Sequence, residues 1–88
     1  MEVKKYLTKP QQVEAVLVEK IWFPNIAIWC GGKISQYYLK EELVDCIELR
    51  NYDEGTLIAK EGDYIIKRPN GFFIVDTDEH FKYNHTEL

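Results

Sequence analysis

Residues 54–75, EGTLIAKEGDYIIKRPNGFFIV, constrain the fold of this chain more than any other stretch. Glycine adopts positive φ at no steric cost, and Asn-Gly is the strongest short hairpin signal. Gly62 and Asn70-Gly71 interrupt three short apolar runs, which are Thr56–Ala59, Tyr64–Ile66 and Phe72–Val75. The pattern predicts three consecutive antiparallel strands, a β-meander, with its tightest turn at Asn70-Gly71.

The N-terminal half begins with a basic stretch and continues as a strand. Lys4–Lys9 is expected to be an exposed lead-in that ends at Pro10, because proline biases the preceding residue towards extended geometry. In Gln11–Glu19, apolar side chains occupy both faces of an extended chain and β-branched residues dominate. We therefore predict a strand that is covered on one face and partly covered on the other.

The middle of the chain is ambiguous in two places. Asn25 is a candidate cap for a short helix over Ile26–Cys30 that closes at Gly31, although the same apolar run also fits a strand. Leu43–Arg50 shows a partial helical stripe, yet its Val, Ile and Cys content favours a strand. Between them, Lys33–Leu39 is predicted to be a strand and Lys40-Glu41-Glu42 a charged turn.

The C-terminal part is predicted to contain a turn and a short helix. The segment 51–55 is expected to turn the chain into the meander. After Val75, Thr77 or Asp78 is a plausible N-cap, with acidic residues in the first turn and Phe81 as an anchor on the sheet. Asn84–Leu88 is expected to fray.

These elements predict the α+β class. We expect a bent, mainly antiparallel sheet of five or six strands, a partial barrel, with one or two short helices, in a single domain over residues 1–88. A chain of 88 residues buries roughly 60–65% of its unfolded surface, so a large internal pocket is not expected. A ligand is then expected at an edge, in a groove or between subunits.

Composition limits the classes of partner. The net charge of −4 and the pI near 5.1 argue against generic nucleic-acid binding, which needs a basic surface. Aromatic residues make up 14% of the chain, too many for all of them to be interior, and clustered exposed aromatics mark interfaces. The two cysteines, Cys30 and Cys46, are expected to be buried free thiols. No apolar run reaches the ~20 residues of a membrane span, and no signal-peptide pattern is present, so a cytoplasmic location is expected.

Catalytic and metal-binding patterns are weak. Asp76, Asp78, His80 and His85 are interpreted as solvated polar residues, because zinc sites want a tight set of N and S ligands. Cys30 and His80 can be drawn as nucleophile and base, but no third group or oxyanion loop is evident. We therefore predict a protein that is not an enzyme and has no metal and no cofactor.

One local basic spot is the candidate binding site. Cationic and aromatic side chains interleave there, and together they suit a phosphate and a ring. The alternative interpretation is that charges at strand ends prevent sheet edges from pairing. The predicted ligand- or partner-binding residues are Lys60, Tyr64, Lys67, Arg68, Asn70 and Phe72.

Two segments resemble a family of small tailed-phage and prophage proteins. Lys4-Lys5-Tyr6, Lys9-Pro10 and Val13-Glu14-Ala15-Val16 are similar to its KKYRKKPVVVEA-like start. The second signature, EGT, GDYIIK and NGEF, is matched by Glu54-Gly55-Thr56, Gly62–Lys67 and Asn70–Phe73. The family usually continues into Tyr-Pro-Cys-Lys-Pro-Asp, where this chain has Phe73–Asp78 without the Cys and both Pro. The resemblance implies a small accessory protein made during phage infection in the host cell.

Two functions follow as hypotheses. The first is a non-enzymatic inhibitor of a host defence factor, which binds either the defence protein or its nucleotide signal, with homo-oligomerisation at sheet edges. The acidic charge favours a protein target and the basic spot favours an anionic nucleotide. The alternative is a structural or regulatory phage protein that acts only through assembly with other proteins.

Overall fold

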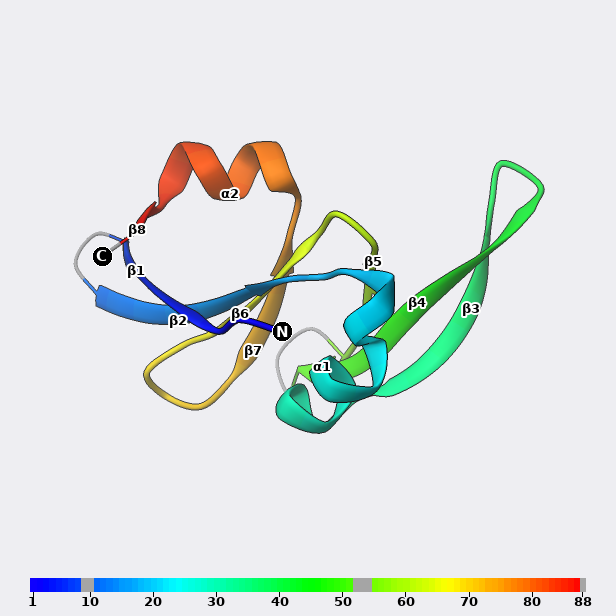
Figure 1. The fold of residues 1–88 in the computed structure, drawn as a ribbon, viewed down its shortest axis with the longest axis horizontal. Coiled ribbons are helices and arrows are strands. Elements are labelled where there is room, and N and C mark those ends of the chain that lie inside the picture. The colour runs from blue at the N-terminus through cyan, green and yellow to red at the C-terminus, as the bar shows by residue number, and fades with distance from the viewer. Residues whose placement is uncertain (9–10, 52–54, 88) are drawn as a thin grey trace.

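The protein is described by a computed structural model that covers residues 1–8, 11–51 and 55–87. Within these residues, two α-helices and one 3₁₀ helix accompany the strands (Figure 1). The elements in chain order are β1 (Lys4–Thr8), β2 (Gln11–Leu17), η1 (Lys20–Trp22), α1 (Phe23–Cys30), β3 (Lys33–Leu39), β4 (Glu42–Asn51), β5 (Gly55–Lys60), β6 (Tyr64–Lys67), β7 (Phe73–Asp76), α2 (Asp78–Asn84) and β8 (Thr86–Glu87).

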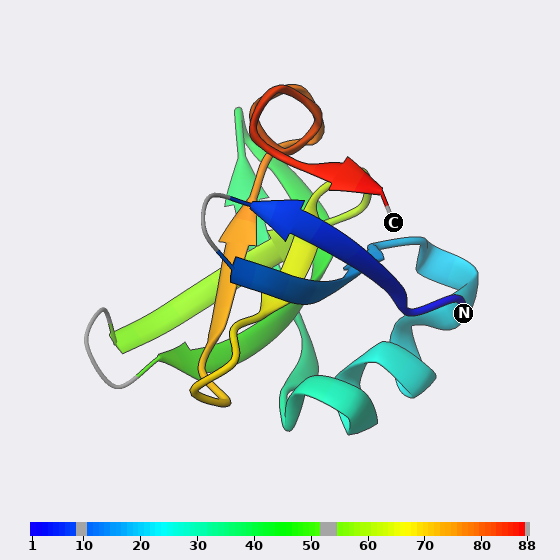
Figure 2. The ribbon, with the colours of Figure 1, turned by 90° about the vertical axis from the view of Figure 1, so that its left-hand side faces the viewer.

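The strands form two antiparallel sheets. One has the order β7-β6-β2-β1-β8 and the other has the order β3-β4-β5. Helix α2 lies against one face of the five-stranded sheet, and the three-stranded sheet with α1 covers the other face (Figures 1 and 2). The expected α+β class is confirmed. The expected single bent sheet is wrong, because the described strands form two sheets that do not close into a barrel.

The main core lies between the two sheets and under α1. Side chains from β2, β4, β5 and β6 meet the buried face of the helix there, and Trp29 packs edge-on against Phe73 at a ring separation of 5.1 Å. Its buried members are Val16, Val18, Phe23, Ile26, Cys30, Ile47, Leu49, Ala59 and Ile65. Cys30 and Cys46 are both buried and free, as expected.

A second, smaller core attaches α2 to the opposite face of the five-stranded sheet. Phe81 is 1% exposed and stacks on Tyr64 with ring centres 3.9 Å apart. His85 stacks on the other side of Phe81 at 4.3 Å, and Tyr6 meets Phe81 edge-on at 4.7 Å. The expectation that Phe81 anchors this helix is confirmed.

The predicted meander is correct in its strands but wrong in its pairing. β6 and β7 form a hairpin, whereas β5 pairs with β4 in the other sheet. The turn between β5 and β6 carries the chain from one sheet to the other, because Gly62 N donates to Val18 O and Val18 N donates to Asp63 O. Val18, just after β2, thus bonds to this turn, while the turn keeps its own hydrogen bond from Asp63 N to Lys60 O.

The Asn70-Gly71 turn is longer than a two-residue hairpin loop. Gly71 has φ 87° and its N–H donates to Arg68 O, while Arg68 N donates to Phe72 O. Asn70 Oδ1 accepts from Phe72 N at 3.0 Å. The loop is thus a turn followed by a left-handed glycine, the usual three-residue hairpin geometry.

Both terminal expectations are corrected. Residues 4–8 form β1, which pairs with β2, so this segment is not an exposed lead-in. Residues 86–87 form β8 on the outer side of β1, so the last residues do not simply fray. In both places a neighbouring strand supplies hydrogen-bond partners that sequence pattern alone does not reveal. Residues 9 and 10 lie outside the described residues.

The predicted helix before Gly31, the two strands after it and the C-terminal helix are confirmed, with shifted boundaries. The helix predicted over Ile26–Cys30 exists but begins at Phe23, so Asn25 lies inside it and is not its cap; Gly31 ends it with φ 68°. Strands form over Lys33–Leu39 and over Glu42–Asn51, with Lys40 and Glu41 as the turn between them. Thr77 caps α2 by accepting from His80 N. The turn expected at 51–55 lies outside the described residues at 52–54.

The stacked aromatic side chains predict a large effect of a single truncation. Phe81→Ala should lower the free energy of unfolding by about 3–5 kcal/mol, because the cavity is enclosed by Tyr64, Tyr6 and His85. Tyr83→Ala is the control on the same helix: Tyr83 is 90% exposed, and its change should stay within about 0.5 kcal/mol. Urea unfolding of the variants measures both, and equal losses would contradict this packing.

Candidate functional site

The six residues predicted to bind a ligand are split between the two ends of β6. At one end, Lys60 Nζ contacts Asp63 Oδ1 at 2.9 Å, and this hydrogen bond raises the pKa of Lys60. Tyr64 follows directly and is buried, with its ring stacked on Phe81. Both side chains serve the fold here: the ammonium is already paired and the aromatic face is covered.

The other four predicted residues surround the β6–β7 turn. Lys67 is half-buried at the end of β6, and Arg68 and Asn70 are exposed in the loop. Phe72 is half-buried, and the Asn70 side chain accepts a hydrogen bond from its backbone N–H. The structure therefore brings Lys67, Arg68, Asn70 and Phe72 together and separates them from Lys60 by the length of a strand.

The same turn borders a small hollow that sequence reasoning missed. Its volume is about 200 Å³, and it is lined by Arg50, Asn51, Gly71, Phe72 and Phe73. Asn51 Nδ2 donates to Phe73 O at 2.8 Å, so this buried amide joins β4 to β7. Among these lining residues, the exposed Arg50 carries the cationic side chain that suits a small anion. Its place beside β7 follows from the tertiary arrangement of β4 and β7 and not from a local sequence pattern.

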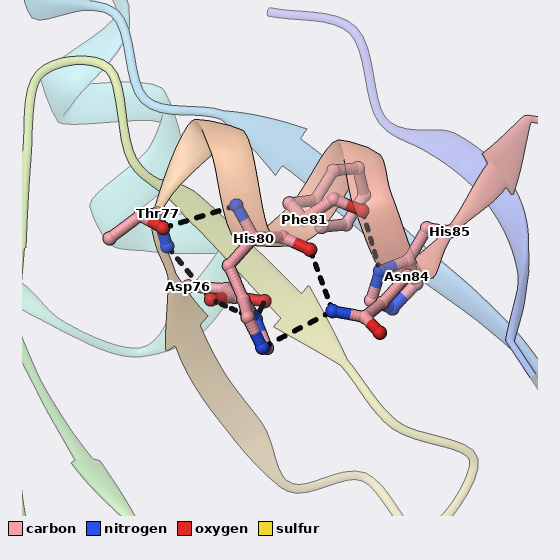
Figure 3. A network of polar contacts seen from close by, with 6 residues as sticks. All are labelled: Asp76, Thr77, His80, Phe81, Asn84 and His85. Atoms are coloured by element: carbon pink, nitrogen blue, oxygen red, sulfur yellow. Dashed lines mark hydrogen bonds and ion pairs between the residues drawn. The ribbon is translucent and has the colours of Figure 1, made fainter.

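The acids and histidines near the C-terminus form a helix-capping network (Figure 3). His80 Nδ1 lies 2.7–2.8 Å from both carboxylate oxygens of Asp76, and its Nε2 lies 3.2 Å from Asn84 Nδ2. Asp76 also accepts from Thr77 N, and Asn84 Nδ2 also donates to His80 O. With Nδ1 donating to Asp76 and Nε2 accepting from Asn84, both ring nitrogens of His80 are engaged within residues 76–84.

Neither cysteine is arranged as a nucleophile with that histidine. Cys30 lies in the core between the sheets, whereas His80 is on α2 at the opposite face of the five-stranded sheet. Burial raises the pKa of both Cys30 and Cys46, which disfavours the reactive thiolate. Across residues 1–8, 11–51 and 55–87, no group of three His, Cys, Asp or Glu side chains is placed to hold a metal ion.

Several exposed apolar side chains lie on the hairpin of β3 and β4, which projects away from the rest of the molecule (Figure 1). Its register pairs Ile34 with Ile47, Gln36 with Asp45 and Tyr38 with Leu43. Residues opposite each other share a face, so this face is continuous with Ile47 and Leu49 in the core. We call three exposed apolar members of this face, Ile34, Tyr38 and Leu43, the hairpin face; these side chains are 51%, 77% and 52% exposed.

A polar network crosses the hairpin face between Ile34, which lies on its core side, and Tyr38 and Leu43, which lie towards the turn. Gln36 Nε2 donates to Asp45 Oδ1 at 2.7 Å, and Lys20 Nζ contacts Asp45 Oδ2 at 3.0 Å. The hydrogen bond from Gln36 and then the Lys20 ammonium lower the pKa of Asp45, and the same carboxylate raises the pKa of Lys20. Lys20 N also donates to Glu61 Oε2 at 3.0 Å. The network ties η1 to the middle of the hairpin and leaves the side chains beyond it uncovered.

The comparisons with known proteins identify no relative. No protein-family model, no curated protein and no solved structure matches the chain. No helix within the described part of the chain is long and apolar enough to cross a membrane.

The Lys20–Asp45 contact predicts a pH-dependent coupling. The folded-state pKa of Asp45 is lowered, so its stabilising contribution is present above the ordinary pKa of about 3.9 and is lost as pH falls through the lower folded value. In a double-mutant cycle of Lys20→Gln and Asp45→Asn, the coupling energy should be favourable near neutral pH and vanish in acid. Urea unfolding at both pH values measures it, and a coupling that persists in acid would contradict the assignment.

Proposed function

We propose that the protein is a non-enzymatic binding protein whose hairpin face contacts a partner protein. The observation that carries this proposal is the exposure of Ile34, Tyr38 and Leu43 on one face of a projecting hairpin. An exposed tyrosine directly opposite an exposed leucine, as Tyr38 is opposite Leu43, suits the apolar centre of a protein interface, where aromatic residues are enriched.

The geometry supports a protein target better than a nucleotide signal. A nucleotide would need cations and aromatic faces at one place, but Lys60 is paired with Asp63 and the Tyr64 ring is stacked in the small core. The hairpin face is apolar, and the chain carries a net charge of −4. A partner with an apolar depression inside a basic rim complements both properties, because opposite charges steer the encounter and set the orientation.

The resemblance to phage accessory proteins gives this binding a biological setting. In that setting the partner is a host defence factor in the cytoplasm of the infected cell, and occupation of its surface inhibits it. The second candidate function is assembly with other phage proteins, in a structural or regulatory role. The outer edge of β3, which no second strand of the described residues covers, also favours this function, since exposed sheet edges pair with other chains.

Variants of the hairpin face test the proposal directly. Leu43→Asp places a charge on the hairpin face, directly opposite Tyr38, without altering the β3 edge, and it should weaken binding to the partner by about 30-fold or more, as expected for a buried interface anchor. Tyr83→Asp is the matched control: it adds the same charge at an exposed position on α2 and should leave affinity unchanged.

The measurement is capture of host and phage proteins on the immobilised wild type and both variants, followed by calorimetry with the purified partner. A host protein that wild type and Tyr83→Asp retain and Leu43→Asp loses supports inhibition of a host factor. Recovery of phage proteins alone supports the assembly alternative. Heat from cyclic or ADP-ribose-type nucleotides, equal for wild type and Leu43→Asp, would contradict the proposal of a protein target at this face.

A further inference from the structure

β3 is an unprotected sheet edge. It is the outer strand of the three-stranded sheet, and β4 is the one strand that pairs with it among the described residues. Its pairing with β4 runs without a bulge from Lys33 to Leu39, and the strand contains no proline. Natural edge strands usually carry a proline, a bulge or an inward charge that prevents pairing with another chain. Here the lysines, Lys33 and Lys40, stand only at the two ends of the strand.

The turn geometry determines which backbone groups point to the free side. Lys40 and Glu41 have φ values of 48° and 69°, and they form a two-residue loop between the paired residues Leu39 and Glu42. In such a loop the flanking pair is hydrogen-bonded, and hydrogen-bonded pairs then alternate along an antiparallel ladder. The odd-numbered residues of β3 therefore bond to β4. The N–H and C=O groups of the even-numbered residues, Ile34, Gln36 and Tyr38, point away from the sheet.

We infer that a second copy of this chain pairs with β3, antiparallel and about a twofold axis through Gln36. This register places Ile34 opposite the partner's Tyr38, Gln36 opposite the partner's Gln36 and Tyr38 opposite the partner's Ile34. All three outward-pointing residues then meet outward-pointing residues. A β-branched residue opposite an aromatic one is among the favourable cross-strand pairs.

Charge and cross-strand pairing favour this register over the registers that are shifted by two residues. In the Gln36 register Lys33 stands beside the partner's Leu39, so no like charges oppose each other within the paired strands. Lys33 already contacts Glu48 of its own chain at 3.7 Å. A shift of two residues towards the turn sets Ile34 beside the partner's Lys40, and a shift the other way sets Tyr38 beside the partner's Gly32. Either shift replaces the two Ile–Tyr pairs and moves an outward residue of β3 beyond the end of the opposing strand.

The dimer extends the proposed function but does not depend on it. A twofold axis perpendicular to the sheet keeps both hairpin faces on the same side, so Leu43 and the partner's Leu43 lie on one six-stranded surface. Such a surface is suited to a symmetric target or to two copies of one target, and bivalent engagement raises the overall affinity.

Amide hydrogen exchange of the wild-type protein is the primary test. In the dimer, the amides of Ile34, Gln36 and Tyr38 should be protected by a factor that rises roughly with the square root of concentration, to about 15-fold when the total protein exceeds its dissociation constant about 100 times. Ser35 and Tyr37 should be protected at every concentration, because their N–H groups bond to β4. Free exchange of Ile34, Gln36 and Tyr38 at the highest concentration would overturn the proposal, whether or not the protein is a dimer.

A matched pair of variants tests the same contact by mass. Gln36→Pro removes an outward N–H, a substitution that edge strands tolerate, whereas Gln36→Ala removes the same side chain and keeps the N–H. In light scattering, wild type and Gln36→Ala should have twice the 10.4 kDa chain mass, and Gln36→Pro should have the single-chain mass. A dimeric Gln36→Pro protein would overturn the proposal. Leu43→Asp should remain dimeric, so loss of partner binding and loss of dimerisation are separate results.

Discussion

The contact between Lys60 and Asp63 stands where the chain passes from one sheet to the other, and the arrangement of both sheets depends on this crossing. The buried Asp63 carboxylate accepts from Lys60 N at 3.1 Å and from Lys60 Nζ at 2.9 Å. The backbone of Gly62 and Asp63 meanwhile pairs with Val18 at the end of β2. Because a buried carboxylate needs such partners, these hydrogen bonds stabilise the geometry of the crossing. That geometry places β5, and with it β4 and β3, against the opposite face of the five-stranded sheet.

The hairpin owes its position to that crossing. β4 is the central strand of its sheet; its inner half carries Ile47 and Leu49 into the core, and its outer half continues beyond the core with Leu43 exposed. The contact of Lys20 with Asp45 connects η1 to β4 at the position where the hairpin leaves the core. The two proposals, partner binding and self-pairing, therefore concern one arm: the first uses the side chains of one face, and the second uses the backbone of one edge.

The sequence predicted where strands and turns lie better than which strands pair. Gly62 and Gly71 do adopt positive φ, and strand boundaries fall within a few residues of the apolar runs. β5 pairs with β4 rather than with β6, and the turn between β5 and β6 bonds to Val18, about forty residues away; no local pattern reports such contacts. For the same reason the sequence pattern groups Lys60 and Tyr64 with the turn at Arg68, although β6 separates the two places. The sequence pattern does not indicate the hairpin face, because Tyr38 and Leu43 resemble ordinary core residues. The strand register is what places them beyond the core.

The central claim is that the β3–β4 hairpin is a preformed, ordered arm, and backbone ¹⁵N relaxation of the isolated protein tests it most directly. The account predicts order parameters near 0.85 for the amides of Tyr38 and Leu43, equal to those of Ile65 in the core. Values below about 0.6 at the hairpin, with Ile65 still rigid, would show a flexible loop and would contradict the claim.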